Sequence, residues 1–163
     1  MSSTHADSTL VLLIRRSPRQ ALRSAYMLVF QVPWLPEWLA CRNGMQAAVD
    51  VLRGSSRPGT FDDAVIGAYR EAWSQPGAWT GMINSYRAAF RRPPLFRERT
   101  RTGVPVLLLW GDQDRFLDPC LASDSVAYCD DGRLVRVPEA THWLHHESPV
   151  VVNRELLTFF STG

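Results

Sequence analysis

The sequence predicts an α/β fold in which a mostly helical stretch is followed by a strand, a helix, a second strand and a closing helix. Before Gly103, apolar residues recur at helical spacing. After it, residues 104–110 form a continuous apolar run, and residues 134–137 form a shorter one. Runs of this kind are typical of parallel strands that are covered on both faces. The hydrophobic fraction of 45% and the charged fraction of 21% fit a soluble globular protein.

Proline, glycine and capping residues mark where the predicted helices begin and end. The first opens at Pro18 and ends before Pro33, and a short one follows Pro36. Another spans about residues 45–52 and stops at Gly54. The next two are separated by Pro76-Gly77, and the first of them opens on a capping-box-like pair, Thr60 and Asp63. The predicted apolar faces are Leu22, Tyr26, Val29 and Phe30; Phe61, Val65, Tyr69, Ala72 and Trp73; and Trp79, Met82, Ile83, Tyr86 and Phe90, the last helix ending at Pro93-Pro94.

The strand part of the sequence has two further helices. A polar crossover helix is predicted between the strands, over about residues 119–128. Ser148-Pro149 opens the closing helix. Its predicted apolar face is Val152, Leu156, Phe159 and Phe160.

Charge and cysteine content exclude several classes of protein. The net charge is only +2, and the eighteen basic residues are all arginines. They are interleaved with acids and accompany no nucleic-acid motif, so we attribute them to compositional bias and expect no nucleic-acid partner. The three cysteines lack disulfide or zinc spacing. The apolar run at residues 10–14 is too short for a membrane span and lacks a preceding basic segment, so we expect a cytoplasmic protein.

Two polar motifs follow the two predicted strands. Asp114 lies in Gly111-Asp-Gln-Asp114, and His142 lies in Ala140-Thr-His-Trp143. Because chemistry collects at the carboxyl ends of parallel strands, both side chains are expected at one rim. A carboxylate there can accept the imidazole Nδ1 proton and leave Nε2 to act as a base. The alternatives are that the first motif is simply a turn and that His142 is a core residue; His145 and His146 are expected at the surface, although a displaced base stays open.

The chain resembles the epoxide hydrolases of the α/β-hydrolase superfamily from about Pro18 to Phe160. It would then be the C-terminal part of that fold, namely a helical cap and the last two parallel strands with their helices. The implied domains are a linker at 1–17, a cap at 18–100 and the core part at 101–163. The resemblance rests on the Asp114 and His142 motifs and on three runs: Tyr26-Met-Leu-Val-Phe-Gln-Val-Pro-Trp-Leu-Pro36, Ser74-Gln-Pro-Gly77 and Asn84-Ser-Tyr-Arg87.

The resemblance implies a role for each of these motifs. Tyr26 and Tyr86 would donate hydrogen bonds to the oxygen of an opening epoxide ring. His142, oriented by Asp114, would activate the water that hydrolyses an alkyl-enzyme ester. This chemistry requires neither a metal nor another cofactor, and its substrate would be a small lipophilic epoxide. Apolar walls are expected from Phe30, Trp34, Phe116 and Trp143.

Two motifs of the family do not occur in the sequence. There is no Gly-x-Asp-x-Gly turn, which carries the family's nucleophile, and no His-Gly-x-Pro oxyanion loop. We therefore expect a truncated enzyme that is inactive alone and needs a complementary N-terminal chain or a homo-oligomer. The alternatives are a non-catalytic fragment in which the cap binds a ligand or partner, and a dehalogenase-type remnant with halide-binding Trp or Asn groups.

Overall fold

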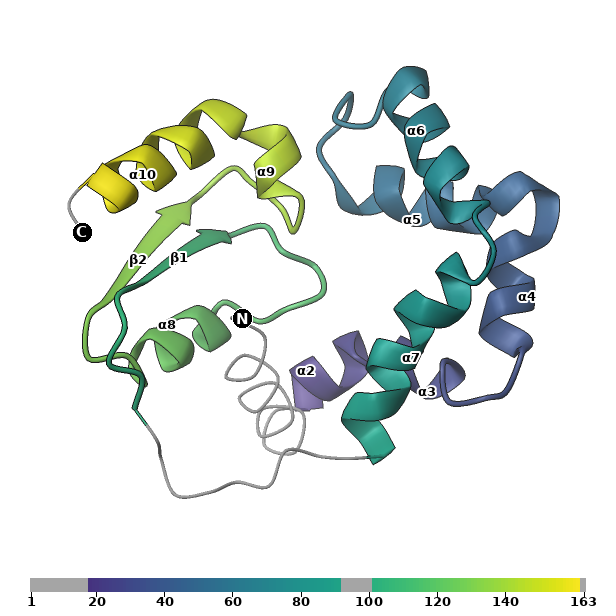
Figure 1. Ribbon diagram of the computed structural model, residues 1–163, viewed down its shortest axis with the longest axis horizontal. Coiled ribbons are helices and arrows are strands. Elements are labelled where there is room, and N and C mark those ends of the chain that lie inside the picture. The colour runs from purple at the N-terminus through teal and green to yellow at the C-terminus, as the bar shows by residue number, and fades with distance from the viewer. Residues whose placement is uncertain (1–17, 92–100, 162–163) are drawn as a thin grey trace.

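The computed structural model describes residues 18–91 and 101–161, which form two parts (Figure 1). We call 18–91 the helical region and 101–161 the sheet region. The predicted apolar run at residues 10–14, the Pro93-Pro94 helix end and the side chain of Phe90 lie outside the described residues.

Short helices joined by tight turns build the helical region. The chain turns sharply between α4 and α5, where Asn43, Gly44 and Met45 all have positive φ. Pro36 stands at the start of α4, and Gly77 has φ +77° in the turn before α7, as proline and glycine at these places predict. The elements are α2 (Pro18–Arg23), α3 (Tyr26–Val29), α4 (Leu35–Cys41), η1 (Arg42–Met45), α5 (Gln46–Ser55), α6 (Asp63–Trp73) and α7 (Ala78–Arg91).

The first predicted helix is divided into two, which corrects the prediction of a single helix opened by Pro18. The chain tightens at Ser24 and Ala25, where the amide of Ala25 donates to the carbonyl of Leu22 and that of Met27 to Ser24. These bonds span three residues instead of four, so the helix is overwound there. The division lets α2 and α3 make different contacts.

The start of α6 also differs from the prediction. Its N-cap is Asp62, whose carboxylate accepts the amide proton of Val65 at 2.8 Å, so the Thr60–Asp63 capping pair was wrong. Phe61, just before this N-cap, is buried. The core of the helical region consists of Val49, Leu52, Phe61 and Ile66, with Val65, Tyr69, Trp73 and Trp143 packed against it.

The sheet region has two parallel strands in direct register, β1 (Val106–Gly111) and β2 (Gly132–Val137). Val106 pairs with Gly132 at one end and Gly111 with Val137 at the other. The crossover helix α8 (Cys120–Val126) covers one face of the strands, and α10 (Pro149–Ser161) covers the other (Figure 1). The strand, helix and crossover predictions are therefore confirmed, although most of β1 is half-buried and not fully buried.

The closing helix α10 turns a different face inward from the predicted one. Glu155 is its buried residue and pairs with Arg133 of β2 and with Arg154. Leu156 and Phe160 are exposed, and Phe160 is 75% exposed. The apolar face predicted for this helix is thus wrong at these two positions, and the buried Glu155 pairs instead with the half-exposed Arg133 of the strand.

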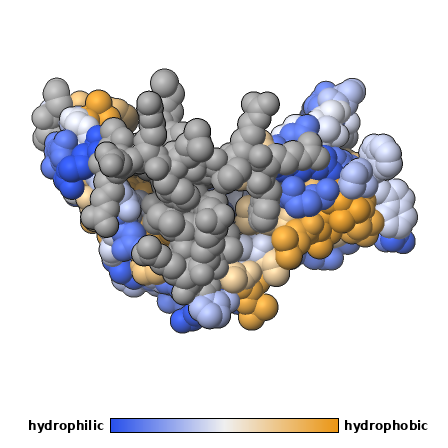
Figure 2. Space-filling view, turned by 90° about the horizontal axis from the view of Figure 1, so that it is seen from below, coloured by the Kyte–Doolittle hydropathy of each residue, from blue (hydrophilic) through white to orange (hydrophobic). Residues whose placement is uncertain are grey.

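The helical region also has exposed apolar residues, and these form a surface. Figure 2 shows apolar side chains gathered at its α3 and α4 side. The exposed residues there include Leu28, Val29, Val32, Trp34, Leu35, Trp38 and Leu39. Within residues 18–91 and 101–161, every helix is too short or too polar to cross a membrane.

Candidate active site

The ends of β1 and β2 bring the two predicted motifs together. The amide of Asp112 donates to the carbonyl of Val137 at 3.1 Å, and that of Gln113 to Ala140 at 2.9 Å. A Cβ on Gly111 would lie 2.2 Å from the carbonyl oxygen of Thr141. Only glycine permits this close approach, so Gly111 has a physical role in joining the loops. We call residues 111–118 the Asp114 loop and residues 138–143 the His142 loop.

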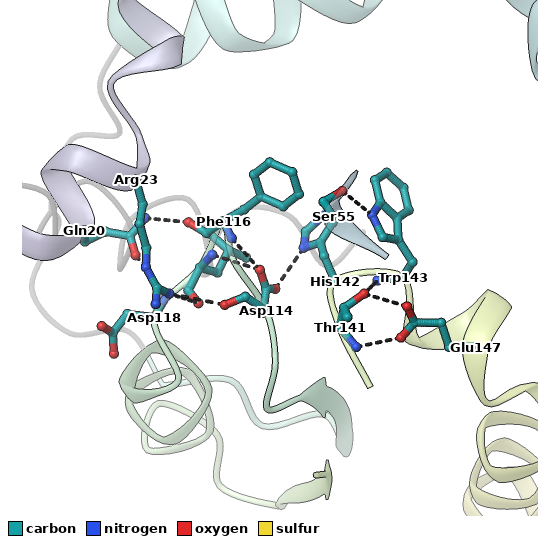
Figure 3. A network of polar contacts seen from close by, with 11 residues as sticks. Gln20, Arg23, Ser55, Asp114, Phe116, Asp118, Thr141, His142, Trp143 and Glu147 are labelled. Atoms are coloured by element: carbon teal, nitrogen blue, oxygen red, sulfur yellow. Dashed lines mark hydrogen bonds and ion pairs between the residues drawn. The ribbon is translucent and has the colours of Figure 1, made fainter. Parts of the chain in front are cut away.

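His142 and Asp114 form the pair that the sequence predicts. Nδ1 of His142 lies 2.9 Å from Oδ2 of Asp114 (Figure 3). The other carboxylate oxygen accepts the amide protons of Phe116 and Leu117 at 2.7 and 3.0 Å. The Asp114 side chain is 6% exposed, whereas that of His142 is 38% exposed. The carboxylate is therefore a fixed acceptor, and the imidazole ring remains accessible.

Two side chains of helix α2 form hydrogen bonds with the backbone of the Asp114 loop. The Gln20 amide donates to the carbonyl of Phe116 at 2.9 Å and accepts the amide proton of Asp118 at 2.9 Å. Arg23 donates to the carbonyls of Leu117 at 2.8 Å and Asp114 at 3.3 Å. Gln20 is fully buried. These side chains satisfy loop groups that would otherwise be costly to bury.

A buried carboxylate, Glu147 of the short helix α9 (Leu144–Glu147), holds the His142 loop. It accepts the amide and hydroxyl protons of Thr141 at 2.6 and 2.8 Å, and the amide proton of Arg57 at 2.7 Å. Burial would raise the pKa of this carboxyl, but the hydrogen bonds from the backbone of Thr141 and Arg57 and from the Thr141 hydroxyl, together with the Arg57 charge, hold the pKa below its usual range. The group is a carboxylate at neutral pH.

The residues beside His142 pack against the helical region. The Trp143 indole N–H donates to the hydroxyl of Ser55 at 2.8 Å, and its ring lies edge-on to Phe61. Nε2 of His146 lies 2.9 Å from the Tyr69 hydroxyl, while His145 is exposed. Among the described contacts of these three residues none involves Asp114, so His142 is the histidine placed to act with it.

An aromatic cluster extends from the histidine toward α3 and α7. The Phe116 ring lies 5.1 Å from His142 and 6.2 Å from Tyr26, between centroids. The Tyr26 and Tyr86 rings are 6.2 Å apart, and Phe30 contacts both of them. Partial burial, together with the neighbouring Tyr86 and Asp114, raises the pKa of the Tyr26 phenol. Tyr26 therefore stays protonated and able to donate at neutral pH.

Not every predicted side chain reaches the cluster. Trp34 is 83% exposed and makes no described ring contact with it. Its backbone is left-handed, at φ 60°, where it precedes α4. Trp143 is placed between His142 and the core of the helical region, and its indole N–H is already bonded. The other predicted residues, Asp114, His142, Tyr26, Tyr86, Phe30 and Phe116, lie together.

Three supporting residues escaped the sequence analysis, namely Gln20, Arg23 and Glu147. Gln20 and Arg23 are not part of the predicted apolar face, and they bind backbone groups more than 90 positions away. Nothing in their local pattern indicates this. Glu147 had one available signal, since it follows the His142 motif closely and precedes a helix-opening Ser-Pro pair. Within the described residues, no group of three His, Cys, Asp or Glu side chains gathers as a metal would need.

A parallel strand–helix–strand unit that presents an aspartate and a histidine at one rim defines the chain as part of an α/β-hydrolase fold. Known proteins that are similar to it narrow the class. The solved epoxide hydrolase of Bacillus megaterium, bound to an inhibitor, superimposes with a TM-score of 0.77 at 25% identity, over 94% of this chain and 56% of that one. No protein-family model matches the sequence.

Curated sequences agree with the structural comparison. The AB hydrolase superfamily protein YfhM of Bacillus subtilis (strain 168) is 39% identical over 87% of this chain. Human epoxide hydrolase 4 is 37% identical over 90% of it. The chain spans 49% of the first and 41% of the second, about half the length of the relatives it matches. It is a relative of the epoxide hydrolases of the α/β-hydrolase superfamily over the part that it spans.

Proposed function

We propose that this chain carries the general base and the proton donors of an epoxide hydrolase site. The observation that supports this most directly is the 2.9 Å contact between His142 and the buried Asp114, with an aromatic cluster leading from that histidine to two tyrosines. Asp114 fixes Nδ1, so Nε2 is the nitrogen that can take a proton. The helical region would be the cap, and residues 101–161 would belong to the hydrolase core.

The proposed reaction opens an epoxide in two steps. A carboxylate attacks one ring carbon, the ring C–O bond breaks, and the developing alkoxide takes a proton from Tyr26 or Tyr86. His142 then removes a proton from water, and the resulting hydroxide attacks the alkyl ester to release a vicinal diol. The proton held by the imidazolium returns to the tyrosine, so epoxide and water yield diol without net proton release. Asp114 stabilises the imidazolium meanwhile.

The attacking carboxylate and the oxyanion donors are proposed to come from polypeptide outside these 163 residues, which contain neither Gly-x-Asp-x-Gly nor His-Gly-x-Pro. The 163-residue chain assayed alone on styrene oxide should then give no turnover above buffer, because loss of a nucleophile costs on the order of a million-fold. A rate well above buffer that disappears in His142→Ala would contradict this.

A chimera tests the chemistry itself. The chain replaces the structurally matched part of the Bacillus megaterium enzyme, and the parent enzyme serves as positive control. The folded chimera should hydrolyse styrene oxide. In its His142→Ala variant the alkyl-enzyme ester should accumulate and appear by mass spectrometry as the protein plus one substrate, because attack does not need the base. A folded chimera that neither turns over nor forms this ester would refute the proposal.

A dehalogenase-type site is less well supported by the same contacts. Halide would need indole or amide N–H groups facing the histidine, yet the Trp143 N–H is bonded to Ser55 and the largely exposed Trp34 has no described ring contact with the cluster. The paired tyrosines suit an alkoxide instead. Haloalkane turnover by the folded chimera without epoxide turnover would favour this alternative.

A non-catalytic binding role is favoured by the exposed apolar surface over α3 and α4 (Figure 2). Light scattering on the isolated chain measures its oligomeric state. A stable folded monomer that binds a lipophilic probe would support this second function, provided that the chimera forms no ester.

A further inference from the structure

Glu147 joins three parts of the molecule that are far apart in sequence. It lies in α9, and its carboxylate accepts both donors of Thr141 (Figure 3). It also accepts the backbone N–H of Arg57. Arg57 lies in the loop between α5 and α6, and its guanidinium donates to the backbone carbonyl of Glu147. The Glu147 side chain is 0% exposed. A single buried carboxylate thus links the helical region to the His142 loop.

The position of Thr141 makes this link relevant to the histidine. Thr141 directly precedes His142, and its carbonyl is the one that approaches Gly111 most closely. The Thr141 hydroxyl is also 3.3 Å from the amide of Trp143, on the other side of the histidine. Glu147 therefore fixes the residue that precedes His142, and the hydroxyl of that residue accepts from the peptide that follows the histidine. The imidazole itself has one described hydrogen bond, to Asp114.

We propose that Glu147 is a positioning residue that couples the docking of the helical region to the orientation of the His142 imidazole against Asp114. With Arg57 in place, the carboxylate holds Thr141, and the backbone directs Nδ1 at Asp114. If the helical region moves away, the carboxylate loses the Arg57 donor and Thr141 is held less firmly. The base would then be aligned only when the helical region covers the site. That His142 acts as a base rests on the proposed function, whereas the coupling between Glu147 and the orientation of the imidazole does not.

The chain contains a matched control for this carboxylate. Glu155 of α10 is also buried and also pairs with arginines, but it contacts Arg133 and Arg154 and no residue of the His142 loop. Glu147→Gln and Glu155→Gln therefore make the same chemical change at two buried carboxylates. In Glu147→Gln the new NH₂ group must face either the Thr141 or the Arg57 N–H, so one buried donor loses its acceptor.

The experiment measures how fast the His142 Nδ1 proton of the 163-residue chain exchanges with water, by imidazole-selective ¹H–¹⁵N NMR. His142→Ala assigns the signal. Glu147→Gln should accelerate the exchange by about tenfold or more, as expected for loss of one buried charge-assisted hydrogen bond. Glu155→Gln should change the Nδ1 exchange rate by less than about twofold. The exchange of the Leu109 amide in β1 reports general loosening of the fold, and its rate should change by less than about twofold in every variant.

Each outcome decides the matter. Unchanged Nδ1 exchange in folded Glu147→Gln would reduce Glu147 to a purely structural role and overturn the proposal, as would lack of a protected Nδ1 proton in the unsubstituted chain. If Glu147→Gln fails to fold, Thr141→Val decides instead, because it removes only the hydroxyl donor; about threefold faster exchange is expected, and no change overturns the proposal. Turnover is not measured, so an inactive chimera would refute the proposed function and leave this result intact.

Discussion

The Asp114 loop and the His142 loop lie side by side, yet they are held in opposite ways. The Asp114 loop offers mainly backbone carbonyls, to which Gln20 and Arg23 of α2 donate, and one amide donor, that of Asp118, which Gln20 accepts. The His142 loop offers backbone and hydroxyl donors, and the Glu147 carboxylate accepts them. The first loop carries the buried member of the pair and the second the accessible one. Both carboxylate oxygens of Asp114, which orients the histidine, are hydrogen-bonded. Within the described residues, His142 is held only through its backbone and Nδ1.

This difference gives an order of expected effects. Changes to the orienting carboxylate should be the most damaging to chemistry, because it has no alternative position. Changes to residues that hold a loop should act mainly on stability. Changes at residues that neither hold a loop nor belong to the aromatic cluster should do little to either.

The largest effect is expected for Asp114→Asn in the epoxide-hydrolysing chimera. The amide cannot stabilise an imidazolium and favours the wrong tautomer, so turnover should fall by about 10⁴-fold. The matched control is Asp112→Asn, two positions earlier, whose carboxylate bonds Arg136 at 2.8 Å and not the histidine. Its turnover should stay within about threefold of the parent chimera, as is usual for a surface ion pair. Equal losses in the two variants would mean that Asp114 acts only through the turn.

The next effect is on folding and concerns Gln20→Ala. Removing this fully buried amide leaves the carbonyl of Phe116 and the amide of Asp118 without the partner described for each. The free energy of unfolding, measured in urea, should fall by about 2–3 kcal/mol. Gln75→Ala removes an exposed side chain whose one described hydrogen bond, to the Glu71 carbonyl, is 3.4 Å long, and the substitution should cost less than about 0.5 kcal/mol. Similar values for both would show that α2 does not hold the Asp114 loop.

The parts of this structure that were predictable from sequence are those that local pattern determines. The apolar run at residues 104–110 predicts β1 because its length and continuity fit a covered strand, and Gly111 and Asp114 follow it at fixed offsets. Gln20 was not predictable, since it acts on Phe116 and Asp118, far along the chain. The burial of Glu155 was not predictable either. Helical spacing favours burial of the apolar residues of α10, whereas Glu155 is buried where it pairs with Arg133 of β2. Patterns of apolar spacing carry no information on which distant backbone group a polar side chain will meet.

The smallest effect is expected at Trp34, which lies outside both loops. Its backbone has φ 60°, a conformation that costs a residue with a Cβ about 1 kcal/mol, and its 83% exposed side chain buries little. Trp34→Gly relieves that cost but gives the unfolded chain more freedom, so the free energy of unfolding should rise by only about 0.5 kcal/mol. Trp38→Gly is the control: Trp38 lies within α4 beneath the Arg42 guanidinium, and its replacement should cost about 1 kcal/mol or more. If Trp34→Gly instead slowed the chimera, Trp34 would reach the substrate during turnover, and the site would extend beyond the two loops and the aromatic cluster.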